Sequence, residues 1–376
     1  MNASPKSYVL RDAMMRDREQ IEKCLEEALI EQRHRLEKYP ALEPYLDALF
    51  KVVMSPGKRI RPLLFAGSFR ALSGFEKETL PSHVTQIAVA LEVFHAFLLI
   101  HDDVIDQSSS RRGEPTLHKH IENLPSIRPR NAECSAIVMG DILQGYVFEL
   151  LVHESIDGPT QRELVRYFSR MIQLTGAGEA LEIHLWDQPI PEVHESWIYS
   201  VYELKTAIYT FESPLVLGAL LANARGNVMQ TIKQASLPIG IAFQIENDLH
   251  EISLDFDAFK DVAYDLQCGV KTLYLRRLYP SLSSDDQAFM NSVLSGKLSA
   301  LEHQRRLHSL LQSEPTFAAL KSEIQSLFDK AAKIFNENSH SENEREAFSE
   351  LYAFISSNRK HSESALRSQA HEASTA

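Results

Sequence analysis

The stretch "VTQIAVALEVFHAFLLIHDDVID" (residues 84–106) is apolar on nearly every side of the helix that it predicts, and it ends in three aspartates. A helix that is apolar all round is buried at the centre of a large helical domain. The stretch therefore predicts an all-α fold assembled around this one segment. It also predicts chemistry at its end, because carboxylates crowded at one helix end repel each other unless a cation joins them.

Helical periodicity continues along most of the chain. Apolar residues recur at three- and four-residue spacing, and no long segment alternates with the period of two that strands show. We expect one all-α domain over residues 1–359, with roughly ten to thirteen helices, loose residues at 1–15 and a disordered polar tail at 360–376. The expected helices cover 17–39, 84–106, 132–153, 160–176, 194–224, 228–251, 284–296, 299–312, 316–336 and 344–357.

Composition narrows the class of protein. Hydrophobic residues make up 44% and charged residues 24% of the chain, as in globular proteins. A net charge of −12 argues against nucleic acid as a partner, because nucleic acids are also negatively charged. Cys24, Cys134 and Cys268 are scattered and odd in number, which favours a reducing, cytoplasmic compartment. The charged N-terminus does not resemble a signal peptide, and no long uninterrupted apolar run predicts a membrane span.

The aspartates at the end of the opening stretch form the first acidic cluster, Asp102, Asp103 and Asp106. Residues at i and i+4 share a helix face, and the C-terminal end of a helix disfavours negative charge. A hard divalent cation relieves both problems, and carboxylates with water suit Mg²⁺. A solvated acidic helix end is the simpler alternative, but the apolar helix that leads into the cluster favours the metal.

The same spacing recurs in "FQIENDLHE" (243–251), where Asn247, Asp248 and Glu251 form a second acidic cluster after another apolar helix. Two such clusters facing each other across a cavity could share metal ions with phosphate oxygens. Basic residues lie beside the predicted helix ends, and arginine in particular matches phosphate oxygens. Any one of them alone is most simply a solvent-facing charge. The basic residues are Lys58, Arg59, Arg61, Arg111, Arg112, Lys205 and Lys260.

Five short motifs together resemble those of the trans-isoprenyl diphosphate synthases, the head-to-tail short-chain prenyltransferases that include farnesyl and geranylgeranyl diphosphate synthases. In chain order they are "GKRIRP" (57–62), "HDDVIDQSSSRRGEPT" (101–116), "MGDIL" (139–143), "ELKTA" (203–207) and "FQIENDL" (243–249). The resemblance implies an isoprenoid-synthase-type helical bundle around a deep central cavity, and a homodimer. It also implies Mg²⁺-dependent condensation of isopentenyl diphosphate with an allylic diphosphate.

The resemblance assigns roles to individual residues. Mg²⁺, as three ions when substrate is bound, is held by Asp102, Asp106, Asn247, Asp248 and Glu251, with Asp103 contributing nearby. The allylic diphosphate is gripped by Arg111, Lys205 and Lys260. Isopentenyl diphosphate is held by Lys58, Arg61, His95 and Arg112. Thr206 and Gln244 place oxygen dipoles beside the allylic cation. Without the resemblance, His95 would be taken for an ordinary core histidine.

The resemblance also bears on product length. In this family, aromatic residues a few positions before the first acidic cluster form a floor that stops the growing chain. Phe97 lies five residues before Asp102, and Phe94 lies three residues further back, although Phe94 is equally consistent with a core phenylalanine. Leu98 is not aromatic, so the floor is not of the shallowest type. We expect a product of fifteen or twenty carbons, with twenty favoured.

The chain departs from the family in the second half of the site. Asn247 and Glu251 stand where aspartates are usual, and Val270 stands where a lysine is usual, with Lys271 beside it. These departures leave two alternatives open, namely a terpene-cyclase-like enzyme on the same fold and a non-catalytic regulatory subunit of a prenyl synthase. The residues that would bind isopentenyl diphosphate argue against the cyclase, and the intact first cluster argues against the regulatory subunit.

Overall fold

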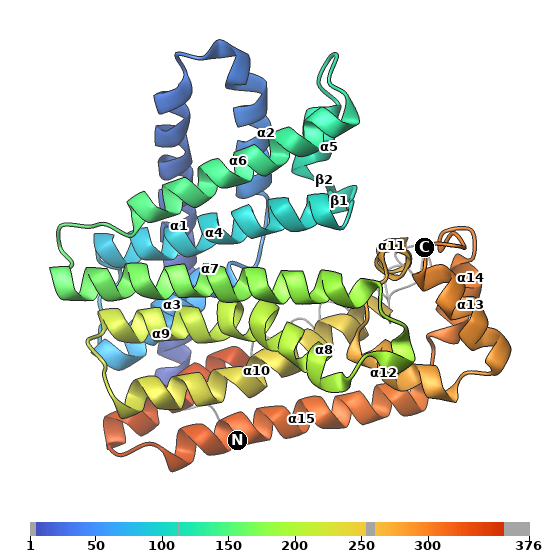
Figure 1. The fold of residues 1–376 in the computed structure, drawn as a ribbon. Coiled ribbons are helices and arrows are strands. Elements are labelled where there is room, and N and C mark those ends of the chain that lie inside the picture. Colours follow the sequence, from blue (N-terminus) through green and yellow to red (C-terminus); the bar gives the residue numbers. More distant parts are fainter. Residues whose placement is uncertain (1–4, 112, 253–259, 357–376) are drawn as a thin grey trace, which may run out of the picture.

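The computed structural model describes the chain at residues 5–111, 113–252 and 260–356. In this part the chain is almost entirely helical, which confirms the predicted all-α fold class (Figure 1). The predicted polar tail at 360–376 lies outside the described residues. Residues 5–15, which we expected to be loose, belong to the first helix.

The α-helices are α1 (Pro5–Leu36), α2 (Glu43–Met54), α3 (Ile60–Ser73), α4 (Ser82–Ile105), α5 (Leu117–Glu122), α6 (Pro129–Leu150), α7 (Gly158–Trp186), α8 (Glu195–Val201), α9 (Ser213–Leu221), α10 (Asn227–Ile252), α11 (Lys260–Cys268), α12 (Leu273–Leu278), α13 (Ser284–Leu294), α14 (Gln304–Leu310) and α15 (Glu314–Glu337). Residues 342–356 form a further helical run. The hairpin pairs β1 (Ser110–Arg111) with β2 (Glu114–Pro115). A π-helix, η3 (Tyr202–Glu212), lies between α8 and α9.

The described part of the chain contains more helices than the ten to thirteen that we expected. Helices α2, α3, α5, α11 and α12 lie outside the ranges that we expected, and two of them, α5 and α12, have only six residues each. A helix of two turns is too short for hydrophobic periodicity to reveal it. The expected long helix at 194–224 consists of three consecutive segments, because the π-helix interrupts it.

α4 is the central helix, as its sequence predicts. It packs against α1, α3 and α6, and nearly all of its apolar side chains are buried. By length and composition alone α4 could cross a membrane, and within the described residues no other helix could. However, 67% of its most apolar window is buried inside the fold. α4 is therefore built as a core helix.

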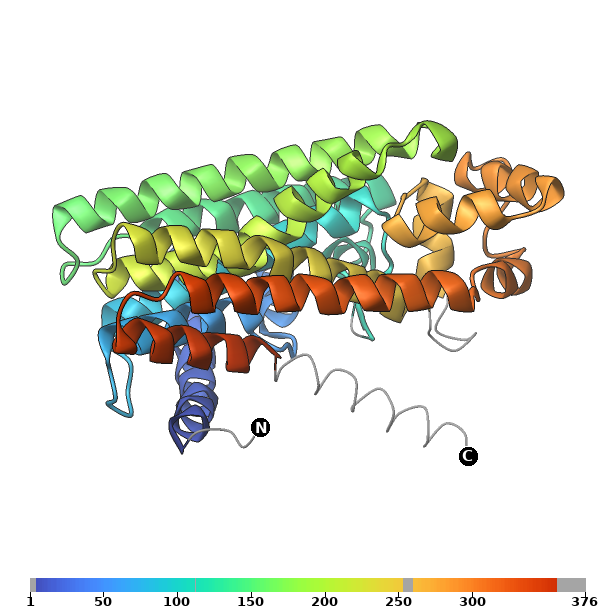
Figure 2. The same cartoon turned by 90° about the horizontal axis from the view of Figure 1, so that it is seen from below.

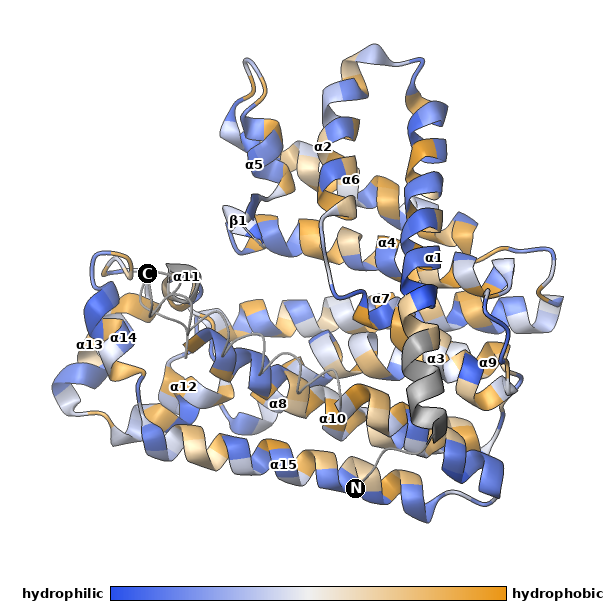
Figure 3. Cartoon of the chain, turned by 180° about the vertical axis from the view of Figure 1, so that it is seen from behind, coloured by the Kyte–Doolittle hydropathy of each residue, from blue (hydrophilic) through white to orange (hydrophobic). Residues whose placement is uncertain are grey.

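The long helices lie in layers on either side of this core. Figure 1 shows α4, α7 and α15 one below another, with α1 and α2 crossing behind α4 and α6. Figure 2 shows α7 and α15 running lengthwise along the molecule. Polar and apolar residues alternate by turns along α15 (Figure 3), as a surface helix requires. The C-terminal end of α4 lies beside the π-helix and α7, because Lys205 of the π-helix contacts both Asp102 and Glu179.

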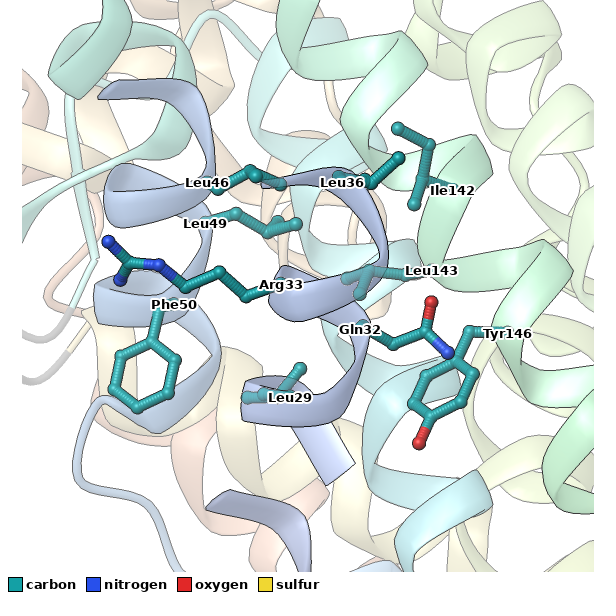
Figure 4. A pocket seen from close by; sticks show the side chains of 10 residues that line it. All are labelled: Leu29, Gln32, Arg33, Leu36, Leu46, Leu49, Phe50, Ile142, Leu143 and Tyr146. Carbon is teal, nitrogen blue, oxygen red and sulfur yellow. The ribbon is translucent and has the colours of Figure 1, made fainter. Parts of the chain in front are cut away.

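Where α1 and α2 cross α6, apolar side chains fill the seam. Figure 4 shows Leu29, Leu46 and Leu143 pointing toward one another across it. The cavity that remains has a volume of about 30 Å³, which leaves space for water but not for a larger ligand. The seam is therefore packing between helices and does not offer a ligand site.

The π-helix is held by two glycines that allow helices to approach closely. A Cβ atom on Gly240 of α10 would lie 2.3 Å from Ala207, and one on Gly178 of α7 would lie 2.8 Å from the backbone nitrogen of Lys205. Real side-chain atoms do not approach so closely, so only glycine permits this packing at both points. The contact fixes Lys205 and Thr206 between α7 and α10.

Candidate functional site

The first acidic cluster lies at the C-terminal end of α4, as predicted. The short hairpin that follows α4 folds back and brings Arg111 to it. Arg111 donates from Nε to Asp103 Oδ1 at 2.8 Å and from Nη2 to Asp102 Oδ2 at 3.1 Å. Such charge-assisted contacts are among the stronger hydrogen bonds in proteins. Arg111 thus places a cation between the two aspartates.

Lys205 reaches the same cluster from the π-helix. Its Nζ lies 3.2 Å from Asp102 Oδ1 and 2.8 Å from Glu179 Oε2, and it also contacts Glu182. Glu179 and Glu182 come from α7, and we did not predict them from the sequence. The only signal was an i, i+3 pair of glutamates, which is indistinguishable from the solvated face of a helix. Lys205 therefore joins α4, α7 and the π-helix through charge.

Negative charge exceeds positive charge at this end of α4, and the pKa values respond. Burial, aided by neighbouring Asp102, raises the pKa of Asp106 from 3.8 to about 8, although Lys205 opposes the rise. Burial also raises the pKa of Asp103 to about 6, against the lowering effect of Arg111. One buried oxygen of Asp106, Oδ1, has no hydrogen-bond partner. A further cation would reduce the repulsion among these carboxylates and would give the Asp106 oxygen a partner.

These features fit Mg²⁺ at Asp102 and Asp106. Within the described residues, no three His, Cys, Asp or Glu side chains converge closely enough to hold a metal ion by themselves. Mg²⁺ commonly keeps several waters and binds through one or two carboxylates together with substrate phosphates. Two carboxylates on one face of the helix end, one with a free oxygen, match that mode of binding.

The second acidic cluster is arranged differently. Asp248 is buried, and it accepts hydrogen bonds from the Tyr202 hydroxyl at Oδ2 and from Gln244 Nε2 at Oδ1, the latter at 2.8 Å. Burial raises the pKa of Asp248 to about 7, although these two hydrogen bonds lower it. Asn247 is partly exposed and Glu251 is exposed. The predicted pair Thr206 and Gln244 does meet, because Thr206 Oγ1 donates to Gln244 Oε1 at 2.7 Å.

A separate group of polar residues lies beside α4 on the side of α3. The Arg61 guanidinium stacks 4.0 Å from the centre of the Tyr209 ring, and it donates to Thr210 Oγ1 at 2.8 Å. His95 hydrogen-bonds to the Tyr209 hydroxyl. Tyr209 therefore brings together two residues that we assigned to isopentenyl diphosphate. We did not predict Tyr209 from the sequence, although it lies four residues after Lys205.

The loop that carries these basic residues is held by Arg59. This residue adopts a left-handed conformation with φ 48° just before α3, which is uncommon for a residue other than glycine. Its guanidinium is buried and donates to Glu92 Oε1 at 2.6 Å. Arg59 is thus bound to α4, while Lys58 is exposed. Arg112 and the Lys260 side chain lie outside the described part of the structure.

A pocket of about 410 Å³ opens between α2 and α4. Its lining includes His95, Asp103 and Arg111, which were all predicted site residues, together with apolar side chains of α2. Pockets for small ligands are typically of this size, with a few charged groups among apolar ones. The charged end of α4 therefore borders a space that can hold a small ligand.

The two predicted floor residues differ in their surroundings. Phe94 is fully buried, with its ring centre 5.7 Å from Phe97, 6.0 Å from Tyr209 and 6.3 Å from Phe168. Phe97 is also buried, although 8% of it remains exposed, and its ring makes an edge contact with His101 at 4.6 Å between ring centres. Phe94 is thus the centre of an aromatic cluster, and Phe97 lies nearer its edge.

Residues 43–311 match the family model described as polyprenyl synthetase. The chain belongs to the polyprenyl synthetase family. It is 27% identical over 290 residues to a geranylgeranyl diphosphate synthase of Saccharolobus solfataricus, which covers 76% of this chain and 80% of the relative. It is also 27% identical over 308 residues to a geranylfarnesyl diphosphate synthase of Aeropyrum pernix, covering 74% and 91%.

The fold of this polyprenyl synthetase has solved counterparts. A crystal structure of a geranylgeranyl pyrophosphate synthase from Corynebacterium glutamicum, complexed with isoprenyl diphosphate and magnesium, matches it with a TM-score of 0.76. The match covers 89% of this chain and 98% of that chain at 23% identity. Family membership confirms that the chain is a prenyltransferase of the isoprenyl diphosphate synthase class. The relatives differ in the product named, so membership does not specify product length.

In this polyprenyl synthetase, Lys271 does not stand in for the lysine that Val270 replaces. Its Nζ donates to the carbonyl of Trp186, the last residue of α7. Lys271 is buried, and burial lowers its pKa from 10.5 to about 8. Lys271 therefore hydrogen-bonds to the end of α7. It does not supply the positive charge that the usual lysine at position 270 would carry.

Asp106 should make the metal-free polyprenyl synthetase less stable as the pH rises. Its folded pKa is raised from 3.8 to about 8, so the folded chain binds this proton more tightly than the unfolded chain does. The resulting loss of stability accumulates as the pH rises from about 4 to about 8 and is complete above that range. We expect Asp106→Asn to raise the melting temperature of the EDTA-treated protein more at pH 8.5 than at pH 5.5, as measured by differential scanning fluorimetry.

The matched control is Asp329→Asn on the exposed side of α15, which should change the melting temperature equally at both pH values. An equal effect of Asp106→Asn at both pH values would contradict the raised pKa.

Proposed function

We propose that the chain condenses isopentenyl diphosphate with an allylic diphosphate, head to tail, and releases a longer trans-prenyl diphosphate. The observation that carries the proposal is the meeting of Arg111 and Lys205 at Asp102. The two cations come from a hairpin and a π-helix far apart in the sequence, and both converge on one end of a buried helix. Such convergence of opposite charges beside a pocket is suited to a diphosphate with its metal ions.

The chain's own residues would bind the allylic diphosphate and orient it for ionisation. Mg²⁺ at Asp102 and Asp106 supplies positive charge to the departing diphosphate. Arg111 and Lys205 donate hydrogen bonds to its oxygens, exchanging their carboxylate partners for phosphate. The Thr206 and Gln244 oxygens lie between this site and the second cluster, where their dipoles can stabilise an allylic cation.

Isopentenyl diphosphate would lie on the neighbouring side of α4. Arg61 and His95 are held there by Tyr209, and the resemblance adds Lys58 and Arg112 to this group. The double bond of isopentenyl diphosphate attacks the allylic carbon, a carbon–carbon bond forms, and the proton lost from the adduct goes to the departing pyrophosphate. The apolar helix faces exclude water, which would otherwise quench the cation.

The decisive experiment incubates purified protein with Mg²⁺, radiolabelled isopentenyl diphosphate and a series of allylic diphosphates. We expect label in an acid-labile prenyl product of greater length. Asp102→Asn should reduce turnover by about a hundredfold or more, because losing about 3 kcal/mol of charge stabilisation in the transition state is equivalent to about two factors of ten in rate. Asp329→Asn, on an exposed helix face, is the matched control and should leave turnover unchanged.

Two results would reject the proposal. Hydrocarbon formed from an allylic diphosphate alone would favour the terpene-cyclase alternative. Absence of product with every primer, combined with tight binding to an active prenyl synthase, would favour the regulatory subunit.

The expected product has fifteen or twenty carbons, with twenty favoured, and Phe97 is the proposed floor. Its ring lies at the edge of the aromatic cluster, while Phe94 lies fully inside it. We expect Phe97→Ala to lengthen the product by at least one isoprene unit, because removing the ring opens space beneath the growing chain. Chromatography of the dephosphorylated products measures the effect, with Phe335→Leu on α15 as a control that should not alter length. An unchanged distribution would exclude Phe97 from this role.

We also propose that the chain forms a homodimer through the outer face of α6. Cys134, Val138, Phe148 and Val152 are exposed in a row along this face and just beyond its end, with Val138 53% and Val152 59% exposed. A row of exposed apolar residues on one helix is typical of an interface. Light scattering should give twice the chain mass, and Val138→Glu should shift it toward one chain. A monomeric wild type would contradict the proposal.

The free cysteines support a cytoplasmic location, which cell fractionation would test.

A further inference from the structure

The hairpin that carries Arg111 is too short to hold itself in place. Each strand has two residues, and the pairing joins Ser110 to Pro115 and Arg111 to Glu114. Pro115 has no N–H and cannot donate to the ladder, and an isolated two-stranded hairpin is marginally stable at best. Contacts outside the ladder must therefore fix the position of Arg111.

Those contacts come from Thr116, the residue that follows the second strand. Its backbone N–H donates to the Ser109 carbonyl at 3.3 Å, and its hydroxyl donates to the Ser108 carbonyl at 2.9 Å. Thr116 is only 1% exposed, so little water can compete for these bonds. The Ser108 N–H in turn donates to the carbonyl of Asp103 at 2.9 Å. Thr116 thus closes the base of the hairpin against the end of α4.

The Thr116 hydroxyl is not used as a helix cap. Threonine is favoured at the position before a helix, where its hydroxyl accepts a hydrogen bond from a backbone N–H of the first turn. Thr116 occupies that position before α5, yet its side chain makes no capping hydrogen bond. The hydroxyl is directed to Ser108 instead, so it stabilises the hairpin and not the helix.

The side chain of His118 contacts this hydroxyl. Its Nδ1 lies 3.3 Å from Thr116 Oγ1. Because the single hydroxyl proton of Thr116 goes to the Ser108 carbonyl, Oγ1 accepts here and Nδ1 carries the proton. Burial lowers the pKa of His118, which favours the neutral ring. His118 therefore holds the Thr116 hydroxyl in the direction in which it donates to the hairpin.

The burial of His118 has an energetic cost. The residue is only 2% exposed, and its buried Nε2 has no hydrogen-bond partner among the described residues. A buried polar atom without a partner is unfavourable, and a leucine at this position would avoid that cost. The contact that a leucine could not make is the one from Nδ1 to Thr116.

We propose that Thr116 and His118 are positioning residues for the Arg111 guanidinium. Through the base of the hairpin they hold Arg111 where its Nε lies 2.8 Å from Asp103 Oδ1 and its Nη2 lies 3.1 Å from Asp102 Oδ2. They act through Arg111 and need not contact the diphosphate themselves. The inference rests on the proposed role of Arg111 in binding the allylic diphosphate.

Binding of an allylic analogue tests Thr116. The full chain is titrated with geranyl thiolodiphosphate, which does not ionise, in the presence of Mg²⁺, and the affinity is measured by isothermal titration calorimetry. We expect Thr116→Val to weaken binding about fivefold, as the loss of one buried hydrogen bond would do. Thr116→Ser restores the hydroxyl and should bind as the wild type does. In steady-state assays, Thr116→Val should raise KM for the allylic diphosphate more than it lowers kcat.

Thr175→Val is the matched control. It makes the same change at another buried threonine, whose hydroxyl has no partner among the described residues, and it should leave the affinity unchanged. Thr116→Val should also have no further effect in an Arg111→Gln background, because the group that it positions is then absent. A purely structural role of Thr116 would give additive effects.

Three variants test His118 and remain informative if Thr116→Val fails to fold. His118→Asn places an amide near the position of Nδ1 and should retain the affinity. His118→Gln places its amide near the position of Nε2 and should weaken binding. His118→Leu should weaken binding to the same extent with little change in melting temperature, because it also removes the unpartnered nitrogen.

Unchanged affinity in Thr116→Val would overturn the inference, as would an undiminished effect of this change in the Arg111→Gln background. Equal affinities of His118→Asn and His118→Gln would exclude His118 from the role. Failure of the analogue to bind the wild type with Mg²⁺ would instead reject the proposed function, and the inference with it, so the two failures are distinguishable.

Discussion

Electrostatic repulsion among carboxylates at the end of α4 is the constraint on which the site depends. Asp102, Asp103 and Asp106 crowd a helix end that already carries partial negative charge, and α7 adds two glutamates. The burial that stabilises α4 makes this repulsion stronger, since charges interact more strongly away from water. Arg111 and Lys205 offset part of it. Burial, together with the negative charge that remains, raises the pKa values of Asp103 and Asp106.

The elements around α4 are placed so that these two cations can reach it. A hairpin turns the chain back to bring Arg111 to the helix that it has just left. The π-helix brings Lys205, and its position depends on the close approach permitted by Gly178 and Gly240. The local geometry of the backbone thus determines where the two positive charges lie. Under the proposed function, metal ions and a diphosphate that arrive together would each neutralise the other's charge at this site.

The second acidic cluster shows that identical spacing does not imply identical use. The second acidic cluster has the same residue spacing as the first, yet its Asp248 is buried and accepts hydrogen bonds from Tyr202 and Gln244. These hydrogen bonds join the π-helix, which carries Lys205 and Thr206, to α10. The carboxylates of the first cluster contact charged side chains, whereas Asp248 accepts hydrogen bonds from neutral ones. Lys271 also has a structural contact, because its Nζ donates to the carbonyl of the last residue of α7. It therefore does not replace the lysine that is usual at position 270.

The sequence by itself determined the fold class, the central helix and the first acidic cluster. Each of these follows from local periodicity or from spacing within one helix, so no knowledge of distant contacts is needed. The same holds for the motifs that identify the family. Helices of two turns, such as α5 and α12, escaped because their periodicity is too short to detect. Only the tertiary structure could reveal Glu179, Glu182 and Tyr209 as neighbours of the site, and Tyr202 as the partner of Asp248. A charged or aromatic residue on a helix has the same local pattern whether it faces solvent or a cavity, and the packing of other helices decides which.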